Sequence, residues 1–183
     1  MIRDIFPKGF FSGFDIPNFD ELLDFCSTQK NHDNDRWDWT EDCKVDTITI
    51  SAKDALPVIS PTLKKFSEII NFDFNCTSTD PWLNNYKRHS YQEVHNHSEH
   101  DFSAVFFMNE GEGFSNFFFY DSPNMGNLRW SKIRKEMGYS NYSFESKRGK
   151  VLIFPGWMDH GVTPHGSDSI RTTLACNFDF QFN

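Results

Sequence analysis

A series of short apolar segments, which starts near residue 72 and runs to the end of the chain, constrains the fold most. The segments are rich in aromatic and β-branched residues, and Gly, Asn, Pro or Asp stands at their ends, which is typical of β-strands joined by turns. Many short strands at this spacing predict a barrel or a sandwich with helices on its flanks. The expected strands cover residues 72–77, 82–89, 91–97, 103–109, 116–120, 141–145, 151–154 and 170–182.

The first third of the chain is expected to supply mostly helices. Apolar residues at helical spacing after Asn18, a suitable N-cap residue, predict a first helix over residues 18–26. Ser60 followed by Pro61 predicts the start of a second helix over residues 60–70, with one apolar stripe along it. A polar loop and a strand are expected between the helices, over residues 29–42 and 45–50.

Length and charge bound the class of protein. The 183 residues contain no internal repeat and no linker, so we expect one domain over residues 1–183. Within it, a helical support covers about residues 1–70 and the barrel core about residues 72–182. The 18 Lys and Arg against 26 Asp and Glu give a net charge of −8. This charge argues against nucleic-acid binding, because Lys and Arg must neutralise the phosphates.

The sequence gives no sign of membrane insertion, secretion or disulfide bonding. No apolar run approaches the ~20 residues that a membrane span needs, and the N-terminal segment MIRDIFPKGFFSGF lacks the features of a secretory signal. We therefore expect a cytoplasmic location. Four widely spaced cysteines form no CxxC pair and are expected to be reduced and mostly buried: Cys26, Cys43, Cys76 and Cys176.

Four of the seven histidines lie within residues 89–100, and two of them, His95 and His97, alternate in an expected strand. Side chains at positions i and i+2 of a strand share a face, so the two imidazoles can converge on one metal ion. The alternative is a pair of surface histidines on a turn. His160 follows a buried apolar strand that ends at Pro155-Gly156.

The last expected strand alternates between an apolar face and a face that carries Arg171 and Thr173. A guanidinium offers a planar fork that suits a carboxylate, and the neighbouring hydroxyl adds a further hydrogen-bonding group. The alternative for Arg171 is a solvated charge on an edge strand.

Together these segments resemble the iron(II)/2-oxoglutarate-dependent dioxygenases, in particular the small prolyl 4-hydroxylase-like oxygenases that are common in marine phages and bacteria. The resemblance rests on order and spacing: a paired ligand strand, an apolar strand, a Phe-Pro-x-Trp turn, a distal histidine and then Arg-x-Thr. It covers most of the chain from about Tyr86 to Phe180. The matching segments are YQEVHNHSEHDFSAVFFMN at 91–109, FSNFFFYDSP at 114–123 and GKVLIFPGWMDHGVTPHGSDSIRTTLACNFDF at 149–180.

The resemblance implies a double-stranded β-helix, which is a jelly-roll or cupin-like barrel, with Fe(II) at its mouth and 2-oxoglutarate and O2 as cosubstrates. It matches His95 to the first iron ligand and His160 to the distal ligand. It matches Arg171 and Thr173 to the pair that binds the far carboxylate of 2-oxoglutarate. The implied reaction is hydroxylation of a substrate with release of succinate and CO2.

The position of the third iron ligand departs from the His-x-Asp or His-x-Glu pattern of the family, because His97 stands where the acid is usually found. Three alternatives are open. His97 completes an all-histidine site, Asp101 or Glu99 supplies a carboxylate, or the site is degenerate and inactive.

Further expectations concern the surroundings of this site. Tyr86 is a candidate for a hydrogen bond to 2-oxoglutarate, with a core aromatic as the alternative. Ser103 and Phe106 are expected to line the barrel. His100 and His165 are expected to be exposed loop residues.

The sequence thus predicts a 2-oxoglutarate-dependent hydroxylase of a small-molecule or peptide substrate, with peptidyl proline as one candidate. The alternative is a non-catalytic cupin-like protein that binds a metal or a ligand. Arg171 and Thr173 discriminate between the two, because a metal-binding module has no use for a carboxylate clamp. Residues 121–140 are expected to form either a lid over the substrate or a solvated helix face.

Overall fold

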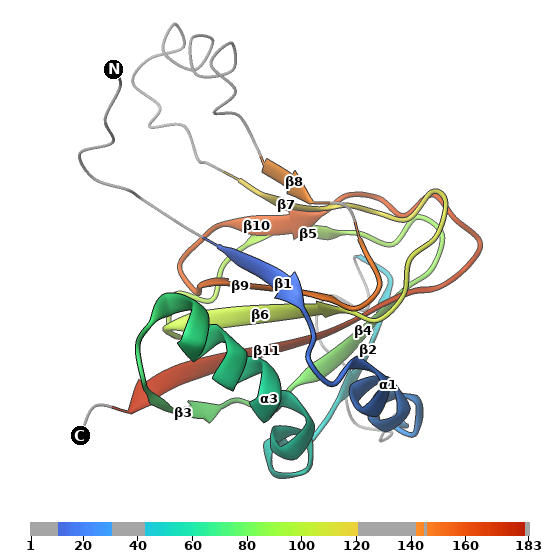
Figure 1. Cartoon of the computed structure of the whole chain (residues 1–183). Helices are drawn as coiled ribbons and strands as arrows, with labels where there is room; N and C mark the ends of the chain where they lie inside the picture. Colours follow the sequence, from blue (N-terminus) through green and yellow to red (C-terminus); the bar gives the residue numbers. More distant parts are fainter. Residues whose placement is uncertain (1–10, 31–42, 121–141, 145, 182–183) are drawn as a thin grey trace, which may run out of the picture.

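Two antiparallel β-sheets face each other, and two helices cover the outer face of the larger sheet (Figure 1). The computed structural model describes residues 11–30, 43–120, 142–144 and 146–181. This arrangement confirms the prediction of a mainly β fold with flanking helices. Residues 121–140, for which a lid or a helix was expected, lie outside the described residues.

The larger sheet has seven strands, and each strand pair in it is antiparallel. From one edge to the other its strands are β1 (Ser12–Asp15), β9 (Lys150–Pro155), β6 (Phe102–Phe107), β11 (Arg171–Gln181), β4 (Trp82–Tyr86) and β2 (Val45–Thr49). A seventh strand, β3 (Asn75–Ser78), pairs with the far end of β11. The long strand β11 therefore runs through the centre of the sheet.

The smaller sheet has four strands and faces the larger one. Its strands are, in spatial order, β5 (Gln92–His95), β10 (His160–Val162), β7 (Phe117–Phe119) and β8 (Tyr142–Phe144). His160 of β10 lies directly opposite His95 of β5 in the strand register. Two of the singled-out histidines are therefore neighbours in one sheet, although 65 residues separate them.

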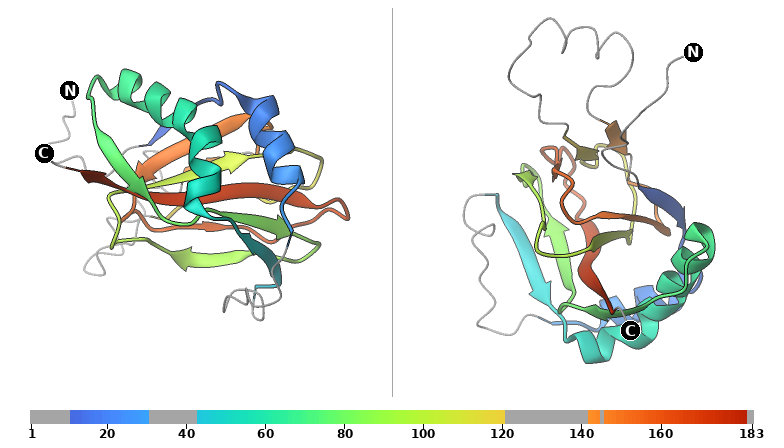
Figure 2. Two further views of the ribbon diagram at one scale, coloured as in Figure 1. Left: turned by 90° about the horizontal axis from the view of Figure 1, so that it is seen from below. Right: turned by 90° about the vertical axis from the view of Figure 1, so that its left-hand side faces the viewer.

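The two helices, α1 (Phe19–Ser27) and α3 (Ala52–Ile70), pack on the side of the large sheet that faces away from the small sheet (Figure 2). Helix α1 begins after Asn18, as predicted. Helix α3 begins at residue 52, so the predicted start at Ser60 is wrong, and Pro57 and Pro61 both lie inside the helix. Pro61 cannot donate to the carbonyl of Pro57, and the hydroxyl of Ser60 donates to that oxygen instead, at 3.1 Å.

A layer of apolar side chains joins the helices to the large sheet. Phe66 of α3 has no exposed surface and packs edge-on against Phe102 of β6, with ring centroids 5.4 Å apart. Phe106 belongs to the same layer, so the prediction that it lines the barrel is wrong. In β6 the side chains alternate, and Ser103 points to the barrel interior while Phe106 points to the helices.

The expected strands are present, but several are shorter than predicted. The predicted strands over 82–89 and 91–97 end at Tyr86 and His95. A turn separates them, in which the Ser90 amide donates to the carbonyl of Lys87 at 2.9 Å. His97 therefore lies beyond the end of its strand, and a turn rather than strand alternation decides where its imidazole points.

Three other features differ from the expectations. Strand β1 lies within the part of the chain expected to be helical, and it joins the edge of the large sheet beside β9. His165 is only 1% exposed. Both of its ring nitrogens are hydrogen-bonded, because Nδ1 accepts from the Ser115 amide and Nε2 donates to the Ser169 carbonyl. His100 is partly buried against Asp179. The prediction that both histidines are exposed loop residues is therefore wrong.

Other sequence expectations concern thiols and membranes. The four cysteines are free, and three of them are buried, as predicted. In the described part of the chain, no helix combines the length and apolar character that crossing a membrane requires.

The aromatic layer under α3 generates the first prediction. We expect Phe66→Ala to lower the free energy of unfolding by about 3–5 kcal/mol, because it leaves a cavity between α3 and the large sheet. Ile69→Ala, on the exposed side of the same helix, is the matched control and should change stability by about 0.5 kcal/mol or less. Urea unfolding measures both values, and similar losses in the two variants would contradict this packing.

Candidate active site

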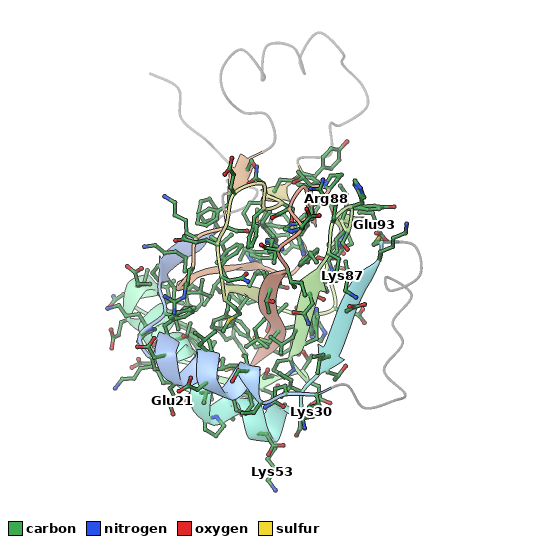
Figure 3. The ribbon with its side chains drawn as sticks, turned by 90° about the vertical axis from the view of Figure 1, so that its right-hand side faces the viewer. Glu21, Lys30, Lys53, Lys87, Arg88 and Glu93 are labelled. Atoms are coloured by element: carbon green, nitrogen blue, oxygen red, sulfur yellow. The ribbon has the colours of Figure 1, made fainter. Side chains whose placement is uncertain are left out.

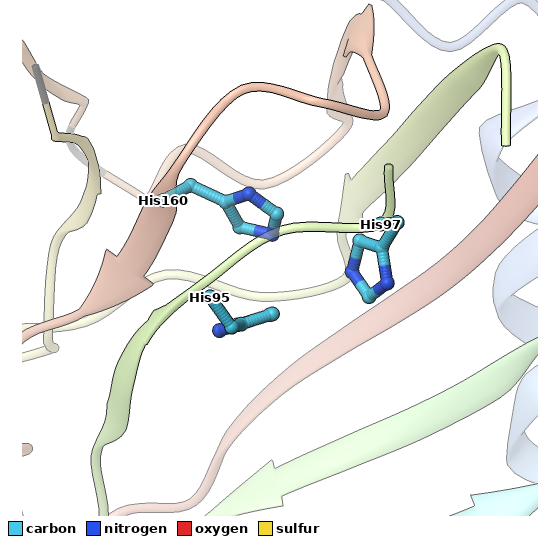
Figure 4. Close-up of side chains that lie close together, drawn as sticks. All are labelled: His95, His97 and His160. Atoms are coloured by element: carbon cyan, nitrogen blue, oxygen red, sulfur yellow. The ribbon is translucent and has the colours of Figure 1, made fainter. Parts of the chain in front are cut away.

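Three imidazoles come together between the two sheets (Figure 4). His95 comes from the end of β5, His160 from the start of β10, and His97 from the turn after β5. Their ligand nitrogens all lie within 4.8 Å of one another. Such a group of nitrogen donors is suited to a transition-metal ion.

Backbone carbonyls orient two of the three rings. Nδ1 of His95 lies 2.8 Å from the carbonyl oxygen of Glu93, and Nδ1 of His160 lies 2.8 Å from the carbonyl oxygen of Met158. A carbonyl oxygen only accepts hydrogen bonds, so each Nδ1 carries the proton. The lone pair is therefore on Nε2 in both rings, which is the arrangement that a metal-binding histidine needs.

A close contact with Gly156 holds the turn that carries His97. The His97 amide donates to the Gly156 carbonyl at 2.7 Å, and the Gly156 amide donates to the Asp101 carbonyl at 3.0 Å. A Cβ atom at position 156 would lie 2.5 Å from the His97 carbonyl oxygen and 2.3 Å from that of His100. Only glycine allows this approach, so Gly156 positions the His97 turn.

A side-chain bond joins the two segments that carry the histidines. Asn96, between His95 and His97, donates through Nδ2 to Oδ1 of Asp159 at 2.8 Å. Asp159 immediately precedes His160. The bond therefore links the two histidine-bearing turns directly.

Burial keeps the three imidazoles neutral. It lowers the pKa of His95, and it lowers the pKa of His160 well below the ordinary value. Burial together with the charges of His95 and His100 lowers the pKa of His97 to about 4. Because metal binding requires neutral imidazole, the environment favours the ligand form at neutral pH.

Arg171 lies at another wall of the same cavity and has no exposed surface. Its Nε donates to Oγ of Ser146 at 2.7 Å, and its guanidinium stacks on the Tyr86 ring at 4.6 Å. Burial lowers the pKa of this guanidinium, and interaction with Tyr86 opposes the shift. Nη1 and Nη2 are both buried without a hydrogen-bond partner among the described residues. A forked donor thus remains available for an anion.

Two further predicted residues lie beside Arg171. Thr173 is two residues along β11 and also lines the cavity. Tyr86 lies opposite Arg171 in the strand register, and its hydroxyl donates to Oε1 of Gln92 at 2.6 Å. The structure thus brings all six predicted site residues to one cavity, namely His95, His97, His160, Arg171, Thr173 and Tyr86.

The two acids considered as alternative ligands lie on the turn after His97. Both are exposed, and neither Asp101 nor Glu99 belongs to the cluster of metal-ligand side chains in the described part of the chain. Oδ2 of Asp101 accepts a hydrogen bond from the Phe180 amide at 2.9 Å. This carboxylate ties the turn to strand β11.

Comparison with known protein families gives one match. The family model described as "Putative 2OG-Fe(II) oxygenase" matches residues 80–177, which is more than half of the chain. The chain belongs to this 2OG-Fe(II) oxygenase family. Enzymes of the family use Fe(II), 2-oxoglutarate and O2. Family membership therefore favours the oxygenase over the non-catalytic cupin-like alternative. No curated protein sequence matches the chain.

Solved structures of similar fold include other oxygenases. A 2OG-Fe(II) oxygenase family oxidoreductase from Burkholderia pseudomallei has a TM-score of 0.67 and 11% identity, covering 92% of this chain and 84% of that one. HygX from Streptomyces hygroscopicus, with nickel and 2-oxoglutarate bound, has a TM-score of 0.62 and 12% identity, covering 94% and 83%. A Pseudomonas putida prolyl-4-hydroxylase has a TM-score of 0.60 and 10% identity, covering 94% and 93%. This likeness concerns the fold, and it confirms the predicted double-stranded β-helix.

Several residues around the oxygenase cavity were not predicted. Trp82 and Asn84 line it on the same face of β4 as Tyr86. Because side chains two residues apart in a strand share a face, the position of Tyr86 could have identified both residues from the sequence. Ser146, the partner of the Arg171 guanidinium, has no such signal. It follows strand β8 in a different part of the chain, and only the fold brings it close.

The neutral state of the histidine cluster generates the second prediction. The pKa of His97 is about 4 in the folded protein, below the ordinary value of 6.5. Between these pH values the unfolded chain binds a proton that the folded protein does not. We therefore expect the metal-free protein to lose stability as the pH falls from about 6.5 toward 4. NMR titration of the His97 ring and urea unfolding at several pH values measure this.

The control for this prediction is His97→Gln, which should show a smaller loss of stability over the same pH range. A His97 titration midpoint near the ordinary value of 6.5 would contradict the burial of this ring.

Proposed function

We propose that this oxygenase hydroxylates its substrate at an iron site formed by His95, His97 and His160, with 2-oxoglutarate held by Arg171 and Thr173. The Nη atoms of the buried Arg171, which have no hydrogen-bond partner among the described residues, carry the proposal. Leaving two donors of a buried cation unpaired and without a counter-charge is costly, so an anion that binds there best explains this arrangement.

The three histidines fit Fe(II). They offer neutral imidazole nitrogens, two of which have their proton fixed on Nδ1 by a backbone carbonyl. Three ligands from the protein leave further metal positions open for a chelating cosubstrate and for O2, as in the facial-triad sites of non-haem iron oxygenases.

An all-histidine site is favoured over a site with a carboxylate. The His97 ring has no hydrogen-bond partner among the described residues, whereas the Asp101 carboxylate already accepts a bond from the Phe180 amide. Moving Asp101 into the site requires breaking that bond. The Asp179 carboxylate also accepts bonds from the turn, from the Asp101 amide at 3.0 Å and from the His100 ring at 3.1 Å.

The Arg171 region fits the far carboxylate of 2-oxoglutarate. The guanidinium presents two donors in one plane, which matches a carboxylate in the bidentate manner. Ser146 and the Tyr86 ring fix the orientation of this plane. We therefore assign Tyr86 to hold the guanidinium, and Thr173 to add a hydroxyl beside it.

The chain's own residues bind, orient and exclude water, while the cofactors carry the redox chemistry. When bound, Fe(II), 2-oxoglutarate and O2 supply the oxidising power for hydroxylation, with succinate and CO2 as the other products. The three histidines would hold the metal, and the Trp82 ring lies beside them, 5.8 Å from the ring of His97. The apolar rings of Phe117 and Phe154 pack against His160 and keep water from that side.

The same proposal extends to the substrate, the domain extent and the cellular location. The substrate is a small molecule or a peptide. A second similar HygX structure has hygromycin B bound beside nickel and 2-oxoglutarate, and another similar structure is a viral collagen prolyl hydroxylase. We further propose one domain over residues 1–183 and a cytoplasmic location.

The Arg171 clamp generates the third prediction. Under anaerobic conditions with Fe(II), we expect Arg171→Met to weaken 2-oxoglutarate binding by about 3–5 kcal/mol, which is more than 100-fold. The same variant should be as stable as the wild type or more stable without ligands, because it removes a buried unpaired cation. Calorimetric titration and thermal unfolding measure the two effects.

Arg88→Met is the matched control, because Arg88 is an exposed arginine that pairs with Asp168 at 2.6 Å. It should bind 2-oxoglutarate as the wild type does. Unchanged binding in Arg171→Met would overturn the assignment.

The choice of third ligand generates the fourth prediction. We expect His97→Ala to lower Fe(II) affinity by more than about 100-fold, which exceeds the usual effect of an outer-shell residue. Asp101→Ala should lower it less, since it loosens only the turn, and Asp101→Asn, which keeps an acceptor oxygen, should lower it least. Iron content after anaerobic dialysis measures the order. A greater loss in Asp101→Ala than in His97→Ala would favour the carboxylate site.

A further inference from the structure

A second polar group lies in the cavity, at the end away from Arg171. Asn177 is six residues further along β11, which is roughly 20 Å at about 3.3 Å per residue. Ser103 lies opposite it on β6. Both side chains line the cavity and are buried, with exposed fractions of 5% and 3%.

One end of the Asn177 amide lacks a partner. Its Oδ1 accepts a hydrogen bond from Oγ of Ser103 at 2.8 Å. Its Nδ2 has no hydrogen-bond partner among the described residues. Nδ2 is not among the fully buried side-chain atoms that lack a partner, so its N–H groups are accessible from the cavity and can donate to a ligand acceptor.

The neighbourhood of Asn177 places this donor near the histidine cluster. Trp82 lines the same part of the cavity, and its ring lies 5.8 Å from the ring of His97. Ala175, between Arg171 and Asn177 on the same face of β11, also lines the cavity and lies opposite Trp82 in the strand register. A group bound to Asn177 therefore lies beside an aromatic surface on the His97 side of the proposed metal site.

Charge restricts what this end of the cavity accepts. Among the cavity-lining residues of the described chain, Arg171 is the one with a formal charge at neutral pH. The nearest charged side chain along β11 is Asp179, two residues beyond Asn177, and it already accepts bonds from the Asp101 amide and the His100 ring. Lys53, Lys87 and Glu93, labelled in Figure 3, do not line the cavity. Burying an ammonium or carboxylate group without a counter-charge is unfavourable, so a neutral group is favoured beside Asn177.

We propose that Asn177, with Ser103 and Trp82, forms a substrate subsite for a neutral amide carbonyl, as in a peptidyl unit or a carboxamide, and that it disfavours free zwitterionic amino acids. The side-chain amide of Asn177 donates to the carbonyl oxygen, and the Trp82 ring covers the adjoining apolar part. The proposal rests on the function proposed above and adds the substrate class.

The experiment compares probes that share a side chain but carry either neutral amide groups or the charged amino and carboxylate groups of the free amino acid. Wild-type protein with Fe(II) and 2-oxoglutarate is titrated with a panel of N-acetyl amino-acid amides and with the same amino acids in free form. The visible charge-transfer band of the iron–2-oxoglutarate chelate is followed without air, and succinate release is followed in air. We expect at least one amide to perturb the band and raise succinate release where its free amino acid does neither.

Variants test the residue assignment. Asn177→Leu should raise the concentration of the active amide needed for half-maximal response by roughly tenfold, through loss of one hydrogen bond in a buried site. Asn177→Asp keeps an acceptor for Ser103 but has no N–H, and it should show a similar loss. The matched control is Asn85→Leu, because Asn85 accepts from the Thr172 hydroxyl at 2.8 Å in the same way but does not line the cavity. Asn85→Leu should respond as the wild type does.

Three outcomes overturn this inference while leaving the proposed function intact, provided that the chelate band forms. They are an absence of response to every amide, an equal response to the free amino acids, and equal responses in Asn177→Leu and Asn85→Leu. If the chelate band does not form in the wild type, the proposed function itself fails.

Discussion

The binding cavity is organised around a buried cation, the guanidinium of Arg171, which has no exposed surface. Among the described residues it has one hydrogen bond, from Nε to Ser146, and it lies over two aromatic rings, Tyr86 and Phe107. Among the described residues, no carboxylate lines the cavity that holds Arg171. A buried guanidinium without a counter-charge favours the binding of an anion, because the attraction between the two charges offsets much of the desolvation cost. Arg171 marks one wall of the cavity, and the three histidines line the same cavity.

The histidine cluster depends on a different kind of constraint, which is hydrogen bonding between segments distant in the chain. Strand register places His160 opposite His95, and carbonyl oxygens fix the proton of each ring on Nδ1. The third ring is positioned by a turn, through the close approach of Gly156 and the ties to strand β11. A metal ion at the proposed site would therefore meet imidazole rings that hydrogen bonds and the turn already orient.

Much of the candidate site was predictable from residue spacing and from the family resemblance. Six cavity residues were named from the sequence, and the two-residue period of β11 correctly placed Arg171 and Thr173 on one face. The errors arose where tertiary contacts override a local pattern. Helix α3 starts before two prolines because a serine hydroxyl satisfies the carbonyl that Pro61 leaves unbonded. His165 lies in a polar loop but is buried, and its two ring nitrogens are hydrogen-bonded to the backbone of Ser115 and Ser169.

The sequence by itself determined a mainly β fold with flanking helices and most of its strands, because side-chain alternation is a local property. The resemblance to the oxygenases, which rests on the order and spacing of motifs, supplied the type of chemistry. Only the tertiary structure decided which of these residues meet. Ser146 reaches Arg171, and Ser103 reaches Asn177, across distances along the chain that no local pattern encodes. Pairing of strands far apart in sequence sets those contacts. Among the described residues, it leaves Nη1 and Nη2 of Arg171 and Nδ2 of Asn177 without hydrogen-bond partners in the same cavity.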